Sequence, residues 1–160
     1  GFFASSSIFI VAGLLAVMAA SDQALNLLSS FEFIQASSKE AWYSKFVILI
    51  LIFIYCFFTF TWCMRQYGFC SVLIGAAPTP NESIDASAKR QLVEHASEVM
   101  DLAGQHFNFG LRGFYFSLAV LAWFIGTVWF VLASVLVVWV LYRREFKSKA
   151  LIALIKARGL

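Results

Sequence analysis

The chain has 160 residues, of which 61% are hydrophobic and 13% are charged, and its formal net charge is +3. Soluble domains average about 45–50% apolar and about 25% charged residues, so this composition excludes an ordinary soluble globular fold. The small net charge, without a basic patch that carries base-stacking aromatics, excludes a typical nucleic-acid-binding protein. The composition, with 18 Phe and 5 Trp, is typical of an integral membrane protein.

Several apolar runs reach the roughly 20 residues that a helix needs to cross a bilayer. They are continuous and lack the period-two alternation of a transmembrane β-barrel. The sequence therefore predicts an all-α polytopic membrane protein that forms one membrane domain over 1–160. The expected spans are about 2–20, 46–64, 108–125 and 128–145, with a cytoplasmic amphipathic helix over about 82–106 and a basic C-terminal tail over 143–160.

The first run, 2–20, follows Gly1 and lacks the basic region that opens a signal peptide. We therefore expect it to span the membrane, in a chain that is either processed or part of something longer. Ala12, Ala16 and Ala20 form a stripe of small residues with Gly13 beside it. Such a stripe lets helices approach closely, either within the chain or against another subunit.

Three cysteines, Cys56, Cys63 and Cys70, lie within and just after the second run, each seven residues from the next. On one helix they share a face, and neighbours lie about 10 Å apart along the axis. This separation is too long for a disulfide, whose Cα atoms lie about 4.4–6.8 Å apart. We expect small buried or interface residues, without a disulfide or a metal.

The polar stretch 82–106 repeats apolar residues at helical spacing, and Asn81 is the predicted N-cap. His95 and His106 are the two histidines, and the second is expected to cap the end of this helix. Eleven residues of helix separate them by roughly 16 Å, so one metal ion cannot bind both. The sequence predicts no metal site.

The last apolar block, 114–142, would be roughly 43 Å long as one straight helix, whereas the hydrocarbon core is about 30 Å thick. The alternatives are one strongly tilted helix, or a tight hairpin broken at Gly126 and Thr127. A hairpin keeps the tail in the cytoplasm and leaves only Lys39 and Lys45 outside among the positive charges. The positive-inside rule therefore favours four spans and a cytoplasmic C-terminus.

The tail RREFKSKALIALIKAR, 143–158, holds six of the twelve Lys and Arg residues. Its apolar residues alternate with cations, which suits a helix on an anionic membrane surface. A solvated terminus is the alternative.

Four strings carry a family resemblance: FFASSSIFIVAGLLA (2–16), FTWCMRQYGFCSVLIGAAP (60–78), HFNFGLRGFYFSLAVLAWFI (106–125) and VLYRREFKSKAL (140–151). Together they resemble the bacterial and plant membrane proteins known as the domain of unknown function 599 family (DUF599). The resemblance covers essentially the whole chain and implies a multi-span protein, without implying a reaction. It also implies that the family's usual N-terminal span and basic connector are missing here, and that Gly126-Thr127 stands where the family often has Asn-Pro. We expect a protein of the bacterial inner membrane.

A candidate binding site gathers arginines expected at the cytoplasmic ends of spans with their aromatic and amide neighbours. The residues are Arg65, Gln66, Tyr67, Trp62, Asn108, Arg112, Tyr115, Arg143 and Arg144. Arg65 and Arg112 could bind an anionic headgroup with their planar forks of donors. The alternative is that each one extends to the interface and anchors its helix.

No catalytic set of residues and no intramembrane carboxylate is visible, so nothing indicates an enzyme or a proton-coupled transporter. We therefore predict a non-catalytic accessory or structural subunit of a larger membrane-protein complex. The alternative is a lipid- or quinone-binding membrane protein that uses the arginine and aromatic site. The expected partners are membrane lipids and other membrane-protein subunits, with no nucleic acid and no cofactor beyond a bound lipid or quinone.

Overall fold

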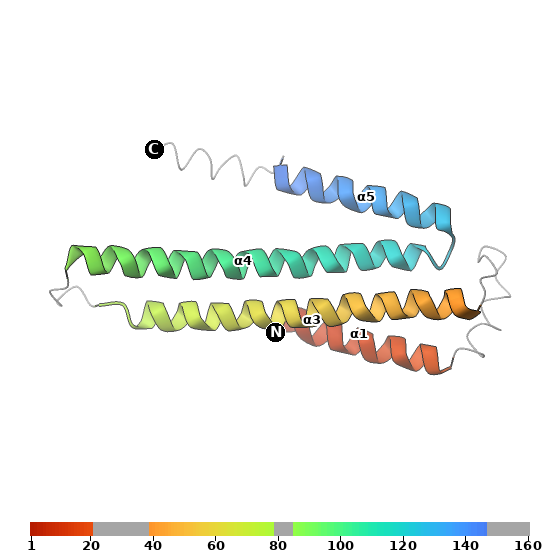
Figure 1. Ribbon diagram of the computed structural model, residues 1–160, viewed down its shortest axis with the longest axis horizontal. Helices are drawn as coiled ribbons and strands as arrows, with labels where there is room; N and C mark the ends of the chain where they lie inside the picture. Colours follow the sequence, from red (N-terminus) through yellow and green to blue (C-terminus); the bar gives the residue numbers. More distant parts are fainter. Residues whose placement is uncertain (21–38, 79–84, 147–160) are drawn as a thin grey trace. The chain divides into compact units, whose positions relative to one another are not determined.

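The computed structural model describes residues 1–20, 39–78 and 85–146, and the regular structure in these ranges is helical. The helices are α1 (Phe2–Ala19), α3 (Lys39–Gly75), α4 (Ala86–Ala122) and α5 (Thr127–Phe146), drawn in Figure 1. Of these, α1, α3 and α5 are long and apolar enough to cross a membrane. Between its ends, a helix satisfies its backbone donors and acceptors internally, which the hydrocarbon requires. The predicted all-α polytopic membrane fold is confirmed.

The last apolar block is two helices. The N–H groups of Trp123, Phe124 and Ile125 donate to carbonyls three residues earlier, at 3.1–3.2 Å, so the chain tightens after α4 before α5 begins. Figure 1 shows the ribbon leave α4 in a short turn and enter α5. The hairpin broken near Gly126 is confirmed, and one long tilted helix is excluded.

The expected separation between the polar helix 82–106 and the span 108–125 is wrong, because residues 86–106 and 107–122 belong to the single helix α4. His106 therefore caps no helix end, and its Nδ1 lies 2.8 Å from the Leu102 carbonyl oxygen inside the helix. The glycines near this point carry no positive φ angle and leave the helix unbroken. The helix α4 is not among the helices apolar enough to span, so the crossing by its second half stays a prediction.

The start of α4 is capped by Asp85. Its carbonyl oxygen accepts the Lys89 N–H at 3.1 Å, and its carboxylate accepts a short hydrogen bond from the Ser87 hydroxyl. The Ser87 side chain, followed by nearby backbone N–H groups, lowers the pKa of Asp85. The helix begins later than expected, so Asp85 fills the role predicted for Asn81. Asn81 and the tail residues 147–160 lie outside the described residues.

The described residues belong to two units. The first contains Gly1–Ala12 and Phe53–Gly113, and the second contains Gly13–Ile52 and Phe114–Leu160.

In the first unit, α3 and α4 pack through a seven-residue repeat. The thiols of Cys56, Cys63 and Cys70 donate to the carbonyl oxygens of Gly110, Ala103 and Ala96, at 3.5, 3.2 and 3.9 Å respectively. Each step of seven residues forward on α3 is matched by seven backward on α4, so the helices are antiparallel. A seven-residue repeat keeps one seam of a helix facing its partner. The prediction of buried cysteines is confirmed, because all three are buried and free.

Two glycines of α4 allow this close packing. A Cβ on Gly110 would lie 2.6 Å from Cζ of Phe60, and a Cβ on Gly113 would overlap the Cys56 thiol. The Phe60 ring has little room to move, since it is buried and stacks on Phe3 of α1 at 5.1 Å between centroids. The bare glycine backbone is therefore required at these positions.

In the second unit, the start of α3 packs against the turn that follows α4 through aromatic side chains. Phe124 makes edge contacts with Trp42 and Phe46, each at 5.1 Å between ring centroids. Both of these α3 residues are buried. Edge-to-face pairs add about 0.5–1.5 kcal/mol beyond their burial, so this cluster fixes the turn that follows α4.

We predict that Gly110→Ala lowers the free energy of unfolding by about 1–3 kcal/mol, the usual cost of overpacking a core. Gly104→Ala is the matched control on the same helix, since nothing lies within 4 Å of a Cβ there. The control should gain up to about 1 kcal/mol from helix propensity. Thermal unfolding in detergent micelles measures both variants, and equal stability of the two would contradict the close packing at Gly110.

Candidate functional site

Two predicted arginines in the first unit lie over aromatic rings of their own helices. The Arg65 guanidinium is 5.5 Å from the Phe69 ring centroid, and that of Arg112 is 5.5 Å from the Phe109 ring centroid. An arginine over a ring gains about 0.5–1 kcal/mol at an exposed site. These positions fit anchoring of each helix at an interface.

The structure does not bring Arg65 and Arg112 together. The hydrogen bond between Cys63 and the Ala103 carbonyl places Arg65 level with Asp101 on α4. Arg112 lies eleven residues further along α4, which is roughly 16 Å of helix. A single headgroup held by both guanidiniums is therefore not supported by this register.

The other predicted residues around these arginines are mostly exposed. Trp62 is 48% exposed and Tyr67 is 41% exposed, and Asn108 also faces outward. Gln66 is buried, and its Oε1 has no hydrogen-bond partner in the described part of the chain. These side chains therefore do not converge on a common point.

The second unit does join two predicted residues from different helices. Arg144 of α5 donates a short hydrogen bond to the Tyr115 hydroxyl of α4, and its guanidinium lies 5.5 Å from the Tyr115 ring centroid. Arg143 lies 5.7 Å from the ring centroid of Trp139. A cationic end of α5 beside aromatic rings is the part of the predicted site that the structure assembles.

Lys45 was missed as a functional position by the sequence reasoning, which only placed it outside the membrane. It is buried at 5% exposure, and its Nζ donates to the Trp123 carbonyl oxygen at 3.1 Å. The same Nζ lies 5.4 Å from the Trp123 ring centroid and 5.6 Å from that of Phe124. A cation at the C-terminal end of a helix meets its exposed carbonyls and favourable dipole. The signal in the sequence was a lysine between Trp42 and Phe46 just before an apolar run.

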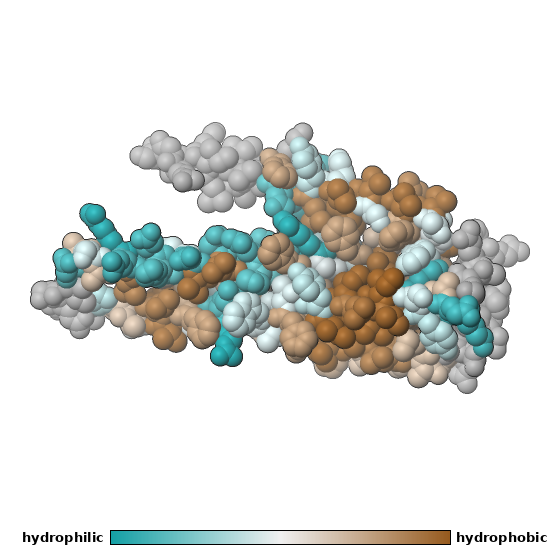
Figure 2. Space-filling view, viewed as in Figure 1, coloured by the Kyte–Doolittle hydropathy of each residue, from teal (hydrophilic) through white to brown (hydrophobic). Residues whose placement is uncertain are grey.

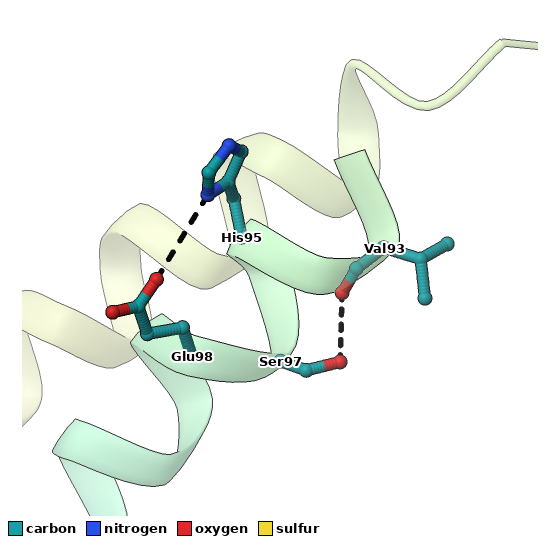
Figure 3. A network of polar contacts seen from close by, with 4 residues as sticks. All are labelled: Val93, His95, Ser97 and Glu98. Carbon is teal, nitrogen blue, oxygen red and sulfur yellow. Dashed lines mark hydrogen bonds and ion pairs between the residues drawn. The ribbon is translucent and has the colours of Figure 1, made fainter. Parts of the chain in front are cut away.

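The polar half of α4 shows no assembled metal centre. In Figure 3 the His95 ring points toward Glu98, with 3.9 Å between Nδ1 and Oε2, and both side chains are 71% exposed. Within residues 1–20, 39–78 and 85–146, no three His, Cys, Asp or Glu side chains gather to hold a metal ion. A shallow hollow on the first turns of α4 is lined by Ala86, Lys89, Arg90, Val93 and Glu94.

We predict that Lys45→Met lowers the free energy of unfolding by about 1–3 kcal/mol, because it removes a charged donor from a part-buried carbonyl. Lys39→Met is the control on the same helix, at an exposed position, and should change stability by less than about 0.5 kcal/mol. Thermal unfolding followed by tryptophan fluorescence reports on the packing around Trp42 and Trp123. Unchanged unfolding of Lys45→Met would show that this lysine does not hold the turn.

Comparison with known proteins identifies the family of this chain but no activity. No curated protein and no solved structure matches the chain. The family model described as "Protein of unknown function, DUF599" matches residues 1–150. This match covers the helices described above and agrees with the resemblance of the four sequence strings. The chain is a member of the DUF599 family of membrane proteins.

Proposed function

We propose that this protein is a non-catalytic accessory subunit that packs through α1 against a larger membrane-protein complex. The observation that carries the proposal is the small-residue stripe of α1. Ala12, Gly13, Ala16 and Ala20 are all exposed, and nothing lies within 4 Å of a Cβ built on Gly13. Within residues 1–20, 39–78 and 85–146, the stripe therefore stays exposed.

Small residues and bulky apolar residues serve different roles in a bilayer. Lipid tails solvate Leu, Val and Phe as well as a protein surface does, so exposed bulky residues need no partner. Small residues instead let two backbones approach and gain van der Waals contact, which is why they are enriched where helices meet. The exposed stripe on α1 supports contact with another helix.

The helix α5, in contrast to the stripe of α1, exposes bulky apolar residues. None of the residues of α5 is buried, and Trp129, Val135 and Trp139 are each more than half exposed. Such a face is suited to lipid or to a second apolar helix. We place the protein in the bacterial inner membrane with its C-terminus in the cytoplasm, since the positive-inside rule favours this orientation.

We predict that Ala16→Leu removes the protein from its complex. A leucine would hold the partner helix away, and a loss of about 1.4 kcal/mol lowers association about tenfold. Native gels of gently solubilised membranes, with mass spectrometry of the co-migrating chains, measure the assembled fraction. Leu15→Phe is the control, since it also adds bulk at an exposed position but lies off the stripe. A wild-type chain that migrates alone would refute the proposal.

A second candidate function is binding of an anionic lipid or a quinone, which the contact between Arg144 and Tyr115 favours. A guanidinium held against a phenol presents its remaining donors in a fixed direction. Anionic lipids also attract cations near the membrane surface by about 1 kcal/mol each.

For this candidate we predict that joint replacement of Arg143 and Arg144 by Gln removes most co-purifying anionic lipid or quinone. Native mass spectrometry of the detergent-solubilised protein measures the bound species. Arg65→Gln is the matched control, because Arg65 contacts a ring of its own helix in the other unit. Equal ligand content in all three proteins would reject the second candidate.

A further inference from the structure

One face of the antiparallel pair formed by α3 and α4 is covered by α1 over part of its length. The ring centroid of Phe3 lies 5.1 Å from that of Phe60 on α3 and 5.8 Å from that of Phe107 on α4. A side chain of α1 therefore packs where the two longer helices meet. Phe3, Phe60 and Phe107 all belong to the first unit, and they mark the face of the pair on which a third helix packs.

The same face continues along the pair as an apolar strip. The cysteine hydrogen bonds match seven residues forward on α3 with seven backward on α4, so one face recurs at every seventh residue of each helix. One and two repeats beyond Phe60 and Phe107 lie the members of the apolar strip: Tyr67, Met100, Ile74 and Val93. Their exposed fractions, in this order, are 41%, 44%, 61% and 60%. The face that is covered at Phe60 is therefore exposed further along.

The apolar strip lies beside ionised side chains that require water. Glu94, Glu98 and Asp101 of α4 are exposed along the same turns. Ionised groups are costly in hydrocarbon, so these turns lie outside the membrane core. Figure 2 shows hydrophobic patches beside the hydrophilic side chains of this part of α4. Apolar side chains gain free energy when they are removed from water, which favours a protein contact at the apolar strip.

The two serines beside the apolar strip already have hydrogen-bond partners. Each lies between the two strip residues of its own helix. The Ser71 hydroxyl donates to the Tyr67 carbonyl oxygen at 3.0 Å, and the Ser97 hydroxyl donates to the Val93 carbonyl oxygen at 2.7 Å. Neither hydroxyl therefore needs water when a second helix covers it. Figure 3 shows the Ser97 bond, with the Val93 side chain pointing away from His95, which lies off the apolar strip.

Positive charge gathers at the end of the apolar strip that is farthest from Phe3. A shallow hollow at this end is lined by two cations and one carboxylate, with two apolar residues: Lys89, Arg90, Glu94, Ala86 and Val93. The dipole of α4 adds partial positive charge, because the helix begins here. The C-terminal end of a second helix fits this position, since its exposed carbonyls and its dipole favour Lys and Arg side chains.

A second copy of the chain does not suit this surface. Copies that share one bilayer have the same orientation, so a pair of strips would bring Lys89 and Arg90 against their own equivalents. Like charges placed together at an interface disfavour association. The charge at the hollow instead favours a partner that carries negative charge at that end.

We propose that the apolar strip binds an amphipathic helix of a partner protein. The apolar residues of this helix recur at steps of three and four and cover Tyr67, Met100, Ile74 and Val93. Its C-terminal end carries acidic residues that meet Lys89 and Arg90. The contact lies outside the membrane core, and it is independent of the accessory-subunit proposal, which concerns α1 within the membrane.

A synthetic helix tests the chemistry of the surface. The probe is a fluorescent peptide of about fourteen residues, roughly four helical turns, held helical by a side-chain crosslink. It carries Leu at steps of three and four and Glu at its C-terminal end. Fluorescence anisotropy measures its binding to the full chain in detergent micelles, and empty micelles give the background. We expect saturable binding to the wild type, and its absence would overturn the proposal.

Matched variants locate the binding of this peptide. Met100→Glu should raise the dissociation constant about tenfold, because it places a charge in the apolar contact. Leu102→Glu is the control, at a similarly exposed apolar residue off the apolar strip, and should leave binding unchanged. Joint replacement of Lys89 and Arg90 by Glu should weaken the acidic peptide and strengthen one that ends in Lys. Circular dichroism checks that each variant is folded, and equal affinity of wild type and Met100→Glu would refute the proposal.

A cysteine reporter tests whether the apolar strip is covered in native membranes. Ser97→Cys places a thiol beside the strip, His95→Cys places one on another face of α4, and the native cysteines are buried. We expect a water-soluble maleimide to label Ser97→Cys several times more slowly than His95→Cys in native membranes, and both at similar rates after purification. Similar rates in native membranes would contradict the proposal. Slow labelling of Ser97→Cys in liposomes that contain only the purified chain would assign the cover to lipid or to the chain itself, and would also overturn it.

Discussion

The close approach of α3 and α4 in the first unit is the constraint on which the described structure depends. Each buried thiol of α3 meets a backbone carbonyl at Gly110, Ala103 or Ala96, where α4 carries no more than a methyl group. Small residues on α4 and cysteines on α3 keep the two helices close together. The α4 carbonyls accept the hydrogen bonds that the thiols donate. A narrow seam fixes the register, because a shift of one residue would drive Phe60 against a side chain in place of Gly110.

The same seam explains why α4 continues where the sequence predicts an end. The polar stretch 82–106 and the apolar run after it differ in composition, and composition alone separates an aqueous helix from a span. Both, however, contribute small residues to one seven-residue repeat, with Ala96 and Ala103 in the polar half and Gly110 in the apolar half. Packing against α3 therefore favours one helix across the change of composition. The seven-residue repeat of α4 can be found in the sequence, but the sequence does not show which helix packs against it.

The hairpin at the end of α4 could be predicted from the sequence, but the lysine contact that holds its turn could not. Charge bias predicted a break near Gly126, since a hairpin keeps the basic tail on the same side as most other cations. Lys45, which binds the turn, lies near the start of α3. Only the folded chain places it beside Trp123. Likewise, the sequence singled out Arg65, Arg112 and Arg144 by their expected place at the ends of spans and by their neighbours along the chain. The antiparallel register then separated the first two, while the contact with Tyr115 gave the third a partner.

The small-residue stripe of α1 and the charged first half of α4 follow the rules of two different solvents. In lipid, apolar bulk gives no advantage to a protein contact, and the exposed residues that favour one are small, as on α1. In water, charged side chains keep their hydration, as on the exposed first half of α4. A residue pattern suited to one solvent would be ineffective in the other. For this reason the proposed contact within the bilayer is assigned to the small stripe of α1 and not to α4.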